Sequence, residues 1–518
     1  MIHRACISLF AAAALLFSCQ KPPASLDEIE VEGGHISGVS TTDGAVRAFK
    51  GIPFAQPPVG DLRWKAPQPV QPWQGVKACT AFGASPVQPA PVPFAVYTQE
   101  YLIPDSPRAE DCLTLNVWTP ARSATDKLPV FVWIYGGGFG SGGSAVPIYD
   151  GEALARKGII VVSVNYRVGI FGFFAHPWLT AESPSGASGN YGLLDQIAAL
   201  GWIQRNIAAF GGDPARVTIG GQSAGSMSVH ALVASPMAKG LFHGAIGQSG
   251  GSRTMAPLTL AEAEARGREF TEKMGINSLE ALRALPADTL LARGSGLGVI
   301  IDGAVLPRPV PEIMASGTHN DVPMMLGWNS DEGFVWESFD AAGWKAKLAS
   351  DYGTHGPALL AAYPAPDDAT ALASQQLFST HLLFGLPIFN WAQLQANHGK
   401  QPVFLYQFAH TPPGPEELRK AGAHHTAEVP YVFSTLRYLN RPWQPEDHAL
   451  ADEISDRWVQ FVKTGKPDSD GSLPWEAFDP AGPKAMRFGT REGKALPEMV
   501  PMPDLDKMRV LEQALEGR

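Results

Sequence analysis

RVTIGGQSAGSMSVHALVAS, residues 216–235, joins a short apolar run to a glycine-rich turn and then to a run of small and apolar residues. A serine at G-x-S-x-G spacing, here Ser223, can lie on a sharp turn between a strand and a helix. Only small neighbours fit such a turn, which holds the hydroxyl out of the sheet. The chain contains 54 glycines, so the spacing alone does not separate a nucleophile from an ordinary turn residue.

Short, unbroken apolar runs on either side of this stretch indicate the fold. They are typical of strands buried on both faces, and they lie at 130–135, 159–164, 217–219 and 322–326. Residues 403–408 alternate like a further strand. Residues 191–210 have apolar positions at helical spacing, between the second and third of these runs. Strand, helix and strand in this order predict an α/β core with a mainly parallel sheet. Ser223 would then lie at a strand-to-helix turn.

A second glycine-rich segment, residues 136–143, directly follows the strand expected at 130–135. Consecutive backbone N–H groups in such a segment can point at one position and hold an oxyanion. The alternative interpretation is a flexible glycine turn. Two glycine elements with matching roles, each after a strand, favour the oxyanion site.

The acid of a serine nucleophile system is expected after the serine in the chain. Asp331 and Glu332 follow the strand expected at 322–326, where a carboxylate can orient an imidazole. The residues alone do not rank these two. Asp302 is a third candidate, although an Asp-Gly pair after apolar residues is more typical of a turn.

The base is expected further along the chain, after the strand at 403–408. Three histidines follow that run, namely His410, His424 and His425. Any histidine near its ordinary pKa can serve as a base, so spacing leaves the choice among them open.

Longer stretches of the sequence resemble the type-B carboxylesterase/lipase family, which includes para-nitrobenzyl esterases and cholinesterases. The resemblance covers about residues 30–500, and its most specific motifs are FGGDPARVTIGGQSAG and EDCLTLNVWTP. It implies an α/β-hydrolase fold, with a central, mostly parallel sheet flanked by helices and with long loops over the active site. It also implies carboxylic ester hydrolysis without a cofactor or a metal ion.

Residue by residue, the resemblance assigns Ser223 as the nucleophile, Glu332 as the acid and His425 as the base. His425 is preferred to His424 because the family's histidine stands at a fixed distance before a run of the type EVPYVF. Acyl-enzyme chemistry on the serine would follow from this set.

The same resemblance suggests two further groups of residues. The backbone N–H groups of Gly137, Gly138 and Ala224 would be the oxyanion donors. Arg63 and Glu110 stand where the family has a structural ion pair.

The chain departs from the family at positions that bear on substrate charge. Gln222 stands where the family usually has a glutamate before the nucleophile. Leu102 falls about where cholinesterases have the tryptophan that holds a quaternary ammonium, although Tyr101 is its neighbour. We therefore expect neutral carboxylic esters to be preferred over cationic ones.

The cysteine pattern also departs from the family. Cys112 matches a disulfide cysteine, but Pro86 stands at the usual partner position. A bridge from Cys112 to Cys79 would be compatible with export, whereas the alternative is two buried thiols.

The N-terminus has the features of an export signal. Residues 1–18 contain an arginine and an apolar stretch too short to span a membrane. The sequence LFSC at 16–19 resembles a bacterial lipobox, so we expect lipidation of Cys19, with simple cleavage as the alternative. Residues 19–30 are interpreted as a tether and 31–518 as a single catalytic domain. The protein would be exported and lipid-anchored in the bacterial cell envelope, or otherwise periplasmic or secreted.

Composition limits the range of partners. The 518 residues carry a formal net charge of −10, and no cluster of Lys and Arg could follow a nucleic-acid backbone. A small ester is therefore the expected partner, with membrane contact only through the lipid anchor. Two alternatives stay open: the same residues acting on amides or lactones, and a non-catalytic cholinesterase-like binding module.

Overall fold

The computed structural model describes residues 28–517, except residues 106, 253–256, 469–470, 492–493 and 496. The expected signal peptide and Cys19 lie outside the described residues. Strand β1 (Glu28–Val31) begins inside the expected tether, and its side chains Ile29 and Val31 are buried. Residues 28–30, which were expected in the tether, therefore belong to the folded part of the chain, because Ile29 and Val31 are buried. None of the helices in the described ranges is long and apolar enough to cross a membrane.

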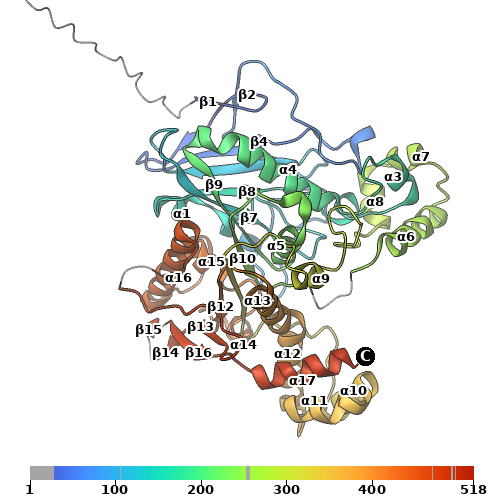
Figure 1. The fold of residues 1–518 in the computed structure, drawn as a ribbon, viewed down its shortest axis with the longest axis vertical. Coiled ribbons are helices and arrows are strands. Elements are labelled where there is room, and N and C mark those ends of the chain that lie inside the picture. The colour runs from blue at the N-terminus through green and yellow to red at the C-terminus, as the bar shows by residue number, and fades with distance from the viewer. Residues whose placement is uncertain are drawn as a thin grey trace, which may run out of the picture.

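An eleven-stranded sheet forms the centre of the protein (Figure 1). Seven neighbouring strands pair in parallel. In sheet order they are β13 (Lys484–Phe488), β12 (Val403–Phe408), β11 (Met324–Asn329), β10 (Gly244–Gln248), β9 (Gly212–Gln222), β7 (Leu128–Ile134) and β8 (Ile160–Val164).

Antiparallel strands complete the sheet at both edges. They are β16 (Glu498–Pro501) beside β13, and β6 (Thr114–Thr119), β4 (Arg47–Pro53) and β3 (Val39–Ser40) beyond β8. The small sheets β1–β2–β5 and β14–β15 contain β2 (Gly34–Ser37), β5 (Val76–Ala78), β14 (Thr490–Arg491) and β15 (Lys494–Ala495). The predicted α/β architecture with a mostly parallel sheet is confirmed.

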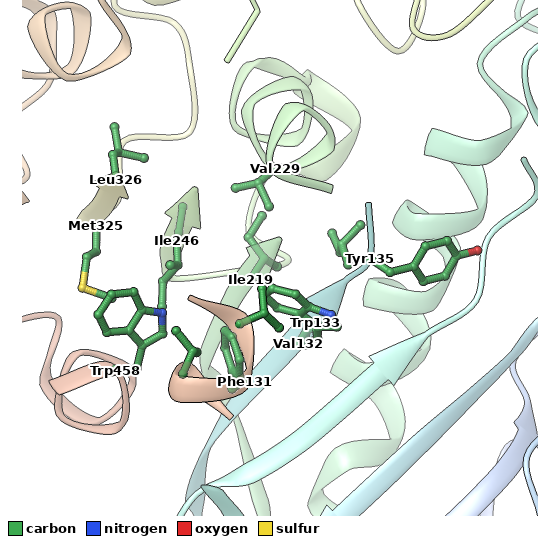
Figure 2. Close-up of a cluster of buried hydrophobic side chains, with 14 of the residues drawn as sticks. Phe131, Val132, Trp133, Tyr135, Ile219, Val229, Ile246, Met325, Leu326 and Trp458 are labelled. Atoms are coloured by element: carbon green, nitrogen blue, oxygen red, sulfur yellow. The ribbon is translucent and has the colours of Figure 1, made fainter. Parts of the chain in front are cut away.

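The central strands form where the sequence has unbroken apolar runs, because both faces of the sheet are covered. Val229 of α5 (Ala224–Ala234) and Trp458 of α16 (Pro445–Thr464) approach the strands from opposite sides (Figure 2). Between them lie buried side chains of the strands, including Ile219 and Ile246. Burial of this apolar surface is the main favourable contribution to folding.

Helices surround the sheet, and Figure 1 shows two groups of them, one at the upper right and one at the bottom of the view. One group contains α3 (Pro177–Glu182), α6 (Leu260–Lys273), α7 (Leu279–Arg283) and α8 (Ala287–Arg293). The other contains α10 (Ala341–Tyr352), α11 (Gly356–Ala362), α12 (Asp368–Thr380) and α17 (Leu505–Glu516). The remaining helices are α1 (Glu152–Arg156), α2 (Gly169–Gly172), α4 (Tyr191–Asn206), α9 (Val310–Ala315), α13 (Leu386–His398), α14 (Glu416–Lys420) and α15 (Val429–Val432).

The carboxyl ends of the parallel strands determine where the candidate residues lie. The glycine segment follows β7, Ser223 follows β9, Glu332 follows β11, and His425 follows β12. Because parallel strands end at the same edge of a sheet, these four segments converge although they are far apart in sequence.

Candidate active site

Ser223 lies at the turn between β9 and α5 and has an unusual backbone conformation. Its φ is 58° and its ψ is −125°, a region that L-residues with a side chain rarely occupy. Its N–H donates to the carbonyl of Gln248 at the end of β10 (2.8 Å). A strained serine on a strand-to-helix turn is the geometry that exposes a nucleophilic hydroxyl.

Two glycines let this turn pack directly against the end of β7. A Cβ at Gly225 would lie 2.1 Å from the carbonyl oxygen of Ile134. A Cβ at Gly136 would lie 2.6 Å from the carbonyl oxygen of Gln222 and 2.9 Å from Cβ of Ser223. Any side chain at either position would push the serine away from the glycine segment, which explains the small residues of both motifs.

The glycine segment after β7 turns back on itself next to Ser223. Gly137 and Gly138 have φ values of 116° and 61°, and the N–H of Ser141 donates to the carbonyl of Gly137 (3.1 Å). Within the described part of the chain, the N–H groups of Gly137, Gly138 and Ala224 donate to no other protein group. These three N–H groups can therefore donate to a ligand oxygen without breaking an existing hydrogen bond.

Glu332 and His425 form a buried hydrogen-bonded pair. Nδ1–H of His425 donates to Oε2 of Glu332 (2.7 Å), while Oε1 of Glu332 accepts the N–H of Asn329 (2.8 Å). Burial raises the pKa of Glu332 and lowers the pKa of His425. The contact to Nδ1 fixes the tautomer that leaves Nε2 able to accept a proton.

The other candidate acids point elsewhere. Asp331 is exposed, and its Oδ2 accepts hydrogen bonds from Ser330 Oγ (2.6 Å) and from the N–H of Ala423 (3.0 Å). Asp302 accepts the N–H groups of Ala304 and Leu306 through Oδ1, and so forms a turn. Neither carboxylate contacts His425 in the described residues.

The other candidate bases are also held by different partners. His410 bonds to Asp447 through Nε2 (2.7 Å). His424 donates from Nδ1 to the carbonyl of His425 (2.9 Å), and its ring lies edge-on to Tyr97 and Tyr101. Only His425 of these histidines combines a carboxylate partner with a position on the cavity next to Ser223.

Aromatic rings hold His425 in place, which the sequence did not indicate. The ring of His425 stacks on Phe384 (centroids 4.5 Å apart, 25° between planes) and meets Phe334 edge-on (5.3 Å). Its carbonyl accepts the hydroxyl of Tyr97 (3.0 Å). Phe384 belongs to a short π-helix at His381–Gly385, and no sequence pattern at that segment marks a site.

A second buried carboxylate, Glu428, lies behind the pair. It accepts hydrogen bonds from Asn329 Nδ2 (2.6 Å) and Gln248 Nε2 (3.0 Å). Burial, followed by the nearby charge of Glu332, raises the pKa of Glu428. Asn329 also donates to the carbonyl of His424 (2.9 Å), so one side chain ties the end of β11 to the histidine loop.

Ser223 and His425 line a common cavity of about 550 Å³. This volume lies within the usual range for small-molecule sites, ~300–1,000 Å³. Its walls come mainly from the long loop at 84–108 and from the glycine segment. The side chains on them are uncharged, and include Gln88, Pro91, Val92, Phe94, Tyr97, Tyr101, Leu102, Ile103, Val146, Tyr149, Gln222, Phe334 and Thr426. Across the described ranges, no cluster of three or more His, Cys, Asp or Glu side chains is arranged to hold a metal ion.

Two structural expectations concern the region beside this loop. Arg63 and Glu110 form a bidentate ion pair, with Nε to Oε2 at 2.6 Å. Cys79 and Cys112 are free thiols, each about 1% exposed, so the suggested bridge between them is absent from the structure. Both thiols pack as small apolar side chains, and burial raises the pKa of each.

The sheet order and the serine turn define the α/β-hydrolase class. The carboxylesterase family model matches residues 25–500. The chain is 38% identical to fumonisin B1 esterase of Sphingopyxis macrogoltabida, covering 89% of this chain and 86% of the relative. It is 37% identical to para-nitrobenzyl esterase of Bacillus subtilis (strain 168), covering 87% and 92%. A solved PNB esterase structure superposes with a TM-score of 0.80 at 33% identity, covering 94% of this chain and 99% of that chain.

This chain belongs to the carboxylesterase family. It is a carboxylic ester hydrolase of type B, and the family, the α/β-hydrolase fold and the class of activity expected from the sequence are confirmed.

Proposed function

We propose that the protein hydrolyses neutral carboxylic esters through an acyl-enzyme formed on Ser223. One geometric observation carries this proposal. The hydrogen-bonded pair of Glu332 and His425 places Nε2 of the histidine on the same cavity that Ser223 and the glycine segment line. Nucleophile, base and oxyanion donors thus face one space large enough for a substrate.

In the proposed reaction, His425 Nε2 takes the hydroxyl proton as Ser223 Oγ attacks the ester carbonyl. Glu332 keeps Nδ1 protonated and stabilises the imidazolium that forms. The proton then passes to the leaving alcohol, and the same histidine activates water to cleave the acyl-enzyme. The N–H groups of Gly137, Gly138 and Ala224 hold the oxyanion in both halves of the reaction.

In the resting structure, Nε2 of His425 lies 3.1 Å from Nε2 of Gln222. The amide therefore uses the lone pair that the mechanism needs. Substrate binding has to exchange this contact for Ser223 Oγ, which agrees with the tendency of catalytic hydrogen bonds to tighten only in the substrate complex.

The preference for neutral esters rests on the cavity walls. No Asp, Glu, Lys or Arg lines the cavity in the described residues. A charged substrate would lose its hydration there without gaining a partner, which is costly. Relatives are named for substrates as different as fumonisin B1, para-nitrobenzyl esters and cocaine. The charge of the cavity, rather than the family, is therefore our basis for the substrate class.

Ser223→Ala tests the proposed nucleophile. It should abolish turnover of p-nitrophenyl butyrate and labelling by a fluorophosphonate. Ser141→Ala is the matched control, because Ser141 lines the same cavity, and it should still be labelled fully. Full labelling of Ser223→Ala would show that another residue is the nucleophile.

We also propose that the protein is exported and anchored by a lipid on Cys19, outside the described residues. The apolar N-terminal stretch and the lipobox-like LFSC sequence support this proposal. Cys19→Ser should release the enzyme from the membrane fraction or block its processing, with specific activity retained. Unchanged membrane partition would exclude the lipid anchor.

A further inference from the structure

The most exposed large apolar side chains of the described residues are three: Trp336, Val92 and Phe94. Their exposed fractions are 81%, 67% and 59%, whereas the next, Leu372, is 49% exposed. Single exposed apolar residues are common on proteins and need no explanation. Several at one place indicate a binding surface.

Two of these side chains line the cavity, and the third packs on a residue that lines it. Val92 and Phe94 line it directly, at the end of a proline-rich stretch of the 84–108 loop. Trp336 stacks on Phe334 (centroids 5.3 Å apart, 27° between planes). Phe334 in turn lines the cavity and contacts the ring of His425. An aromatic series therefore runs from the candidate base to the surface.

Phe94 and Trp336 have different supporting contacts. Phe94 packs on Tyr97 (4.9 Å), which is itself fixed by its hydroxyl bond to the carbonyl of His425. The backbones of Phe94 and Tyr97 also exchange hydrogen bonds, so this segment is a tight turn. Trp336 is supported by the Phe334 ring, which packs against one face of the indole. The other face of the Trp336 indole is exposed, so it can contact solvent or a ligand.

We infer that Trp336, together with Val92 and Phe94, binds the distal apolar part of the ester substrate where it leaves the cavity. The inference rests on the proposed function and narrows its substrate class to neutral esters that carry an extended alkyl or aryl group. The occupant is the substrate itself, because Trp336 stacks on Phe334, which lines the cavity that holds the ester. An indole offers a large, rigid apolar face for such a group.

The test is a comparison of kcat/KM for long and short neutral esters, kept below their aggregation concentration. One series varies the acyl chain with a constant p-nitrophenyl group, and the other varies the alcohol with a constant acetyl group. In at least one series, Trp336→Ala should lower the ratio of long-ester to short-ester kcat/KM by roughly tenfold, a change of about 1.4 kcal/mol. Trp336→Phe should restore most of the ratio, because a ring remains.

Two further variants control for fold and position. The double variant Val92→Ser/Phe94→Ser should lower the same ratio of long-ester to short-ester kcat/KM. Leu473→Ala removes another exposed apolar side chain outside the cavity lining and should leave the ratio unchanged. All variants are checked for an unchanged Tm.

The inference is overturned if neither Trp336→Ala nor the double variant changes the ratio in either series. A defect confined to emulsified substrate would also overturn it, because the residue would then act at an interface rather than on the bound chain. Failure of the proposed function is seen separately, as turnover that survives Ser223→Ala.

Discussion

The side-chain amide of Gln222 contacts both ring nitrogens of His425, including the one that donates to Glu332. Gln222 Nε2 lies 3.1 Å from His425 Nε2, while Nδ1 of the same ring donates to Glu332 at 2.7 Å. The histidine thus contacts both a carboxylate and a neutral amide. A carboxylate in place of that amide would place a second negative charge on the ring.

Gln222→Glu should shift the acidic limb of the kcat/KM profile to higher pH. The new carboxylate stabilises the imidazolium and so raises the pKa of His425, which burial otherwise lowers. Because the base must be neutral, activity at acidic pH falls, and we expect the limb to move by about one pH unit. The midpoint of this limb is the apparent pKa of the coupled pair of Glu332 and His425, not the pKa of one residue.

Gln222→Ala is the control for this shift. It removes the amide contact, which favours the neutral imidazole, without adding charge, so its acidic limb should move upward less than that of Gln222→Glu. An equal upward shift in both variants would mean that loss of the contact, rather than charge, sets the pKa of the pair.

Glu332→Gln should lower kcat by orders of magnitude with the fold intact, because the amide cannot stabilise the imidazolium. Asp331→Asn, one residue earlier and exposed, should change kcat little. Steady-state kinetics on p-nitrophenyl butyrate measure both. A severe loss in Asp331→Asn with a mild one in Glu332→Gln would reverse the assignment.

His425→Ala should leave almost no turnover, because no other described histidine both contacts Glu332 and lines the cavity. His424→Ala should keep most of its turnover per folded molecule, although it leaves a gap beside Tyr97 and Tyr101. Activity is normalised to the folded fraction measured by thermal unfolding. The opposite pattern would show that His424 is the base.

A neutral butyryl thioester should be a better substrate than butyrylthiocholine, judged by kcat/KM with leaving groups of similar reactivity. A choline head is held by an aromatic face and a carboxylate, typically worth ~1–2 kcal/mol. The described cavity wall has no carboxylate, and Leu102 supplies no ring. A clear advantage for the choline ester would indicate that an aromatic such as Tyr101, which lines the cavity, supplies a cation site.

Much of the fold could be predicted because its strands are buried on both faces. The runs at 130–135, 159–164 and 403–408 correspond to β7, β8 and β12 with shifts of a few residues at most. Chain order also located the candidate segments, since parallel strands end at one edge. The early start of β1 was missed because Ile29 and Val31 alternate with charged residues in a stretch interpreted as a tether.

The hydrogen-bond and packing partners of the site residues could not be predicted from the sequence alone. Asp331 and Glu332 are neighbours, and only the turn after β11 decides which carboxylate faces inward. The family pattern preferred Glu332, but it gave no sign of Phe384 beneath His425 or of Trp336 at the surface. These contacts join segments far apart in sequence, so no local periodicity marks them.

The backbone conformation of Ser223 lowers the folding stability of the protein, although the activity depends on it. A φ of 58° is a conformation that glycine adopts at little cost, whereas strain of this kind in other residues costs ~1–3 kcal/mol. Glycine at this position would relieve the strain but remove the hydroxyl. A search for thermostable variants that did not measure turnover would therefore select substitutions that remove the proposed nucleophile. At Ser223 a lower folding stability accompanies the catalytic function.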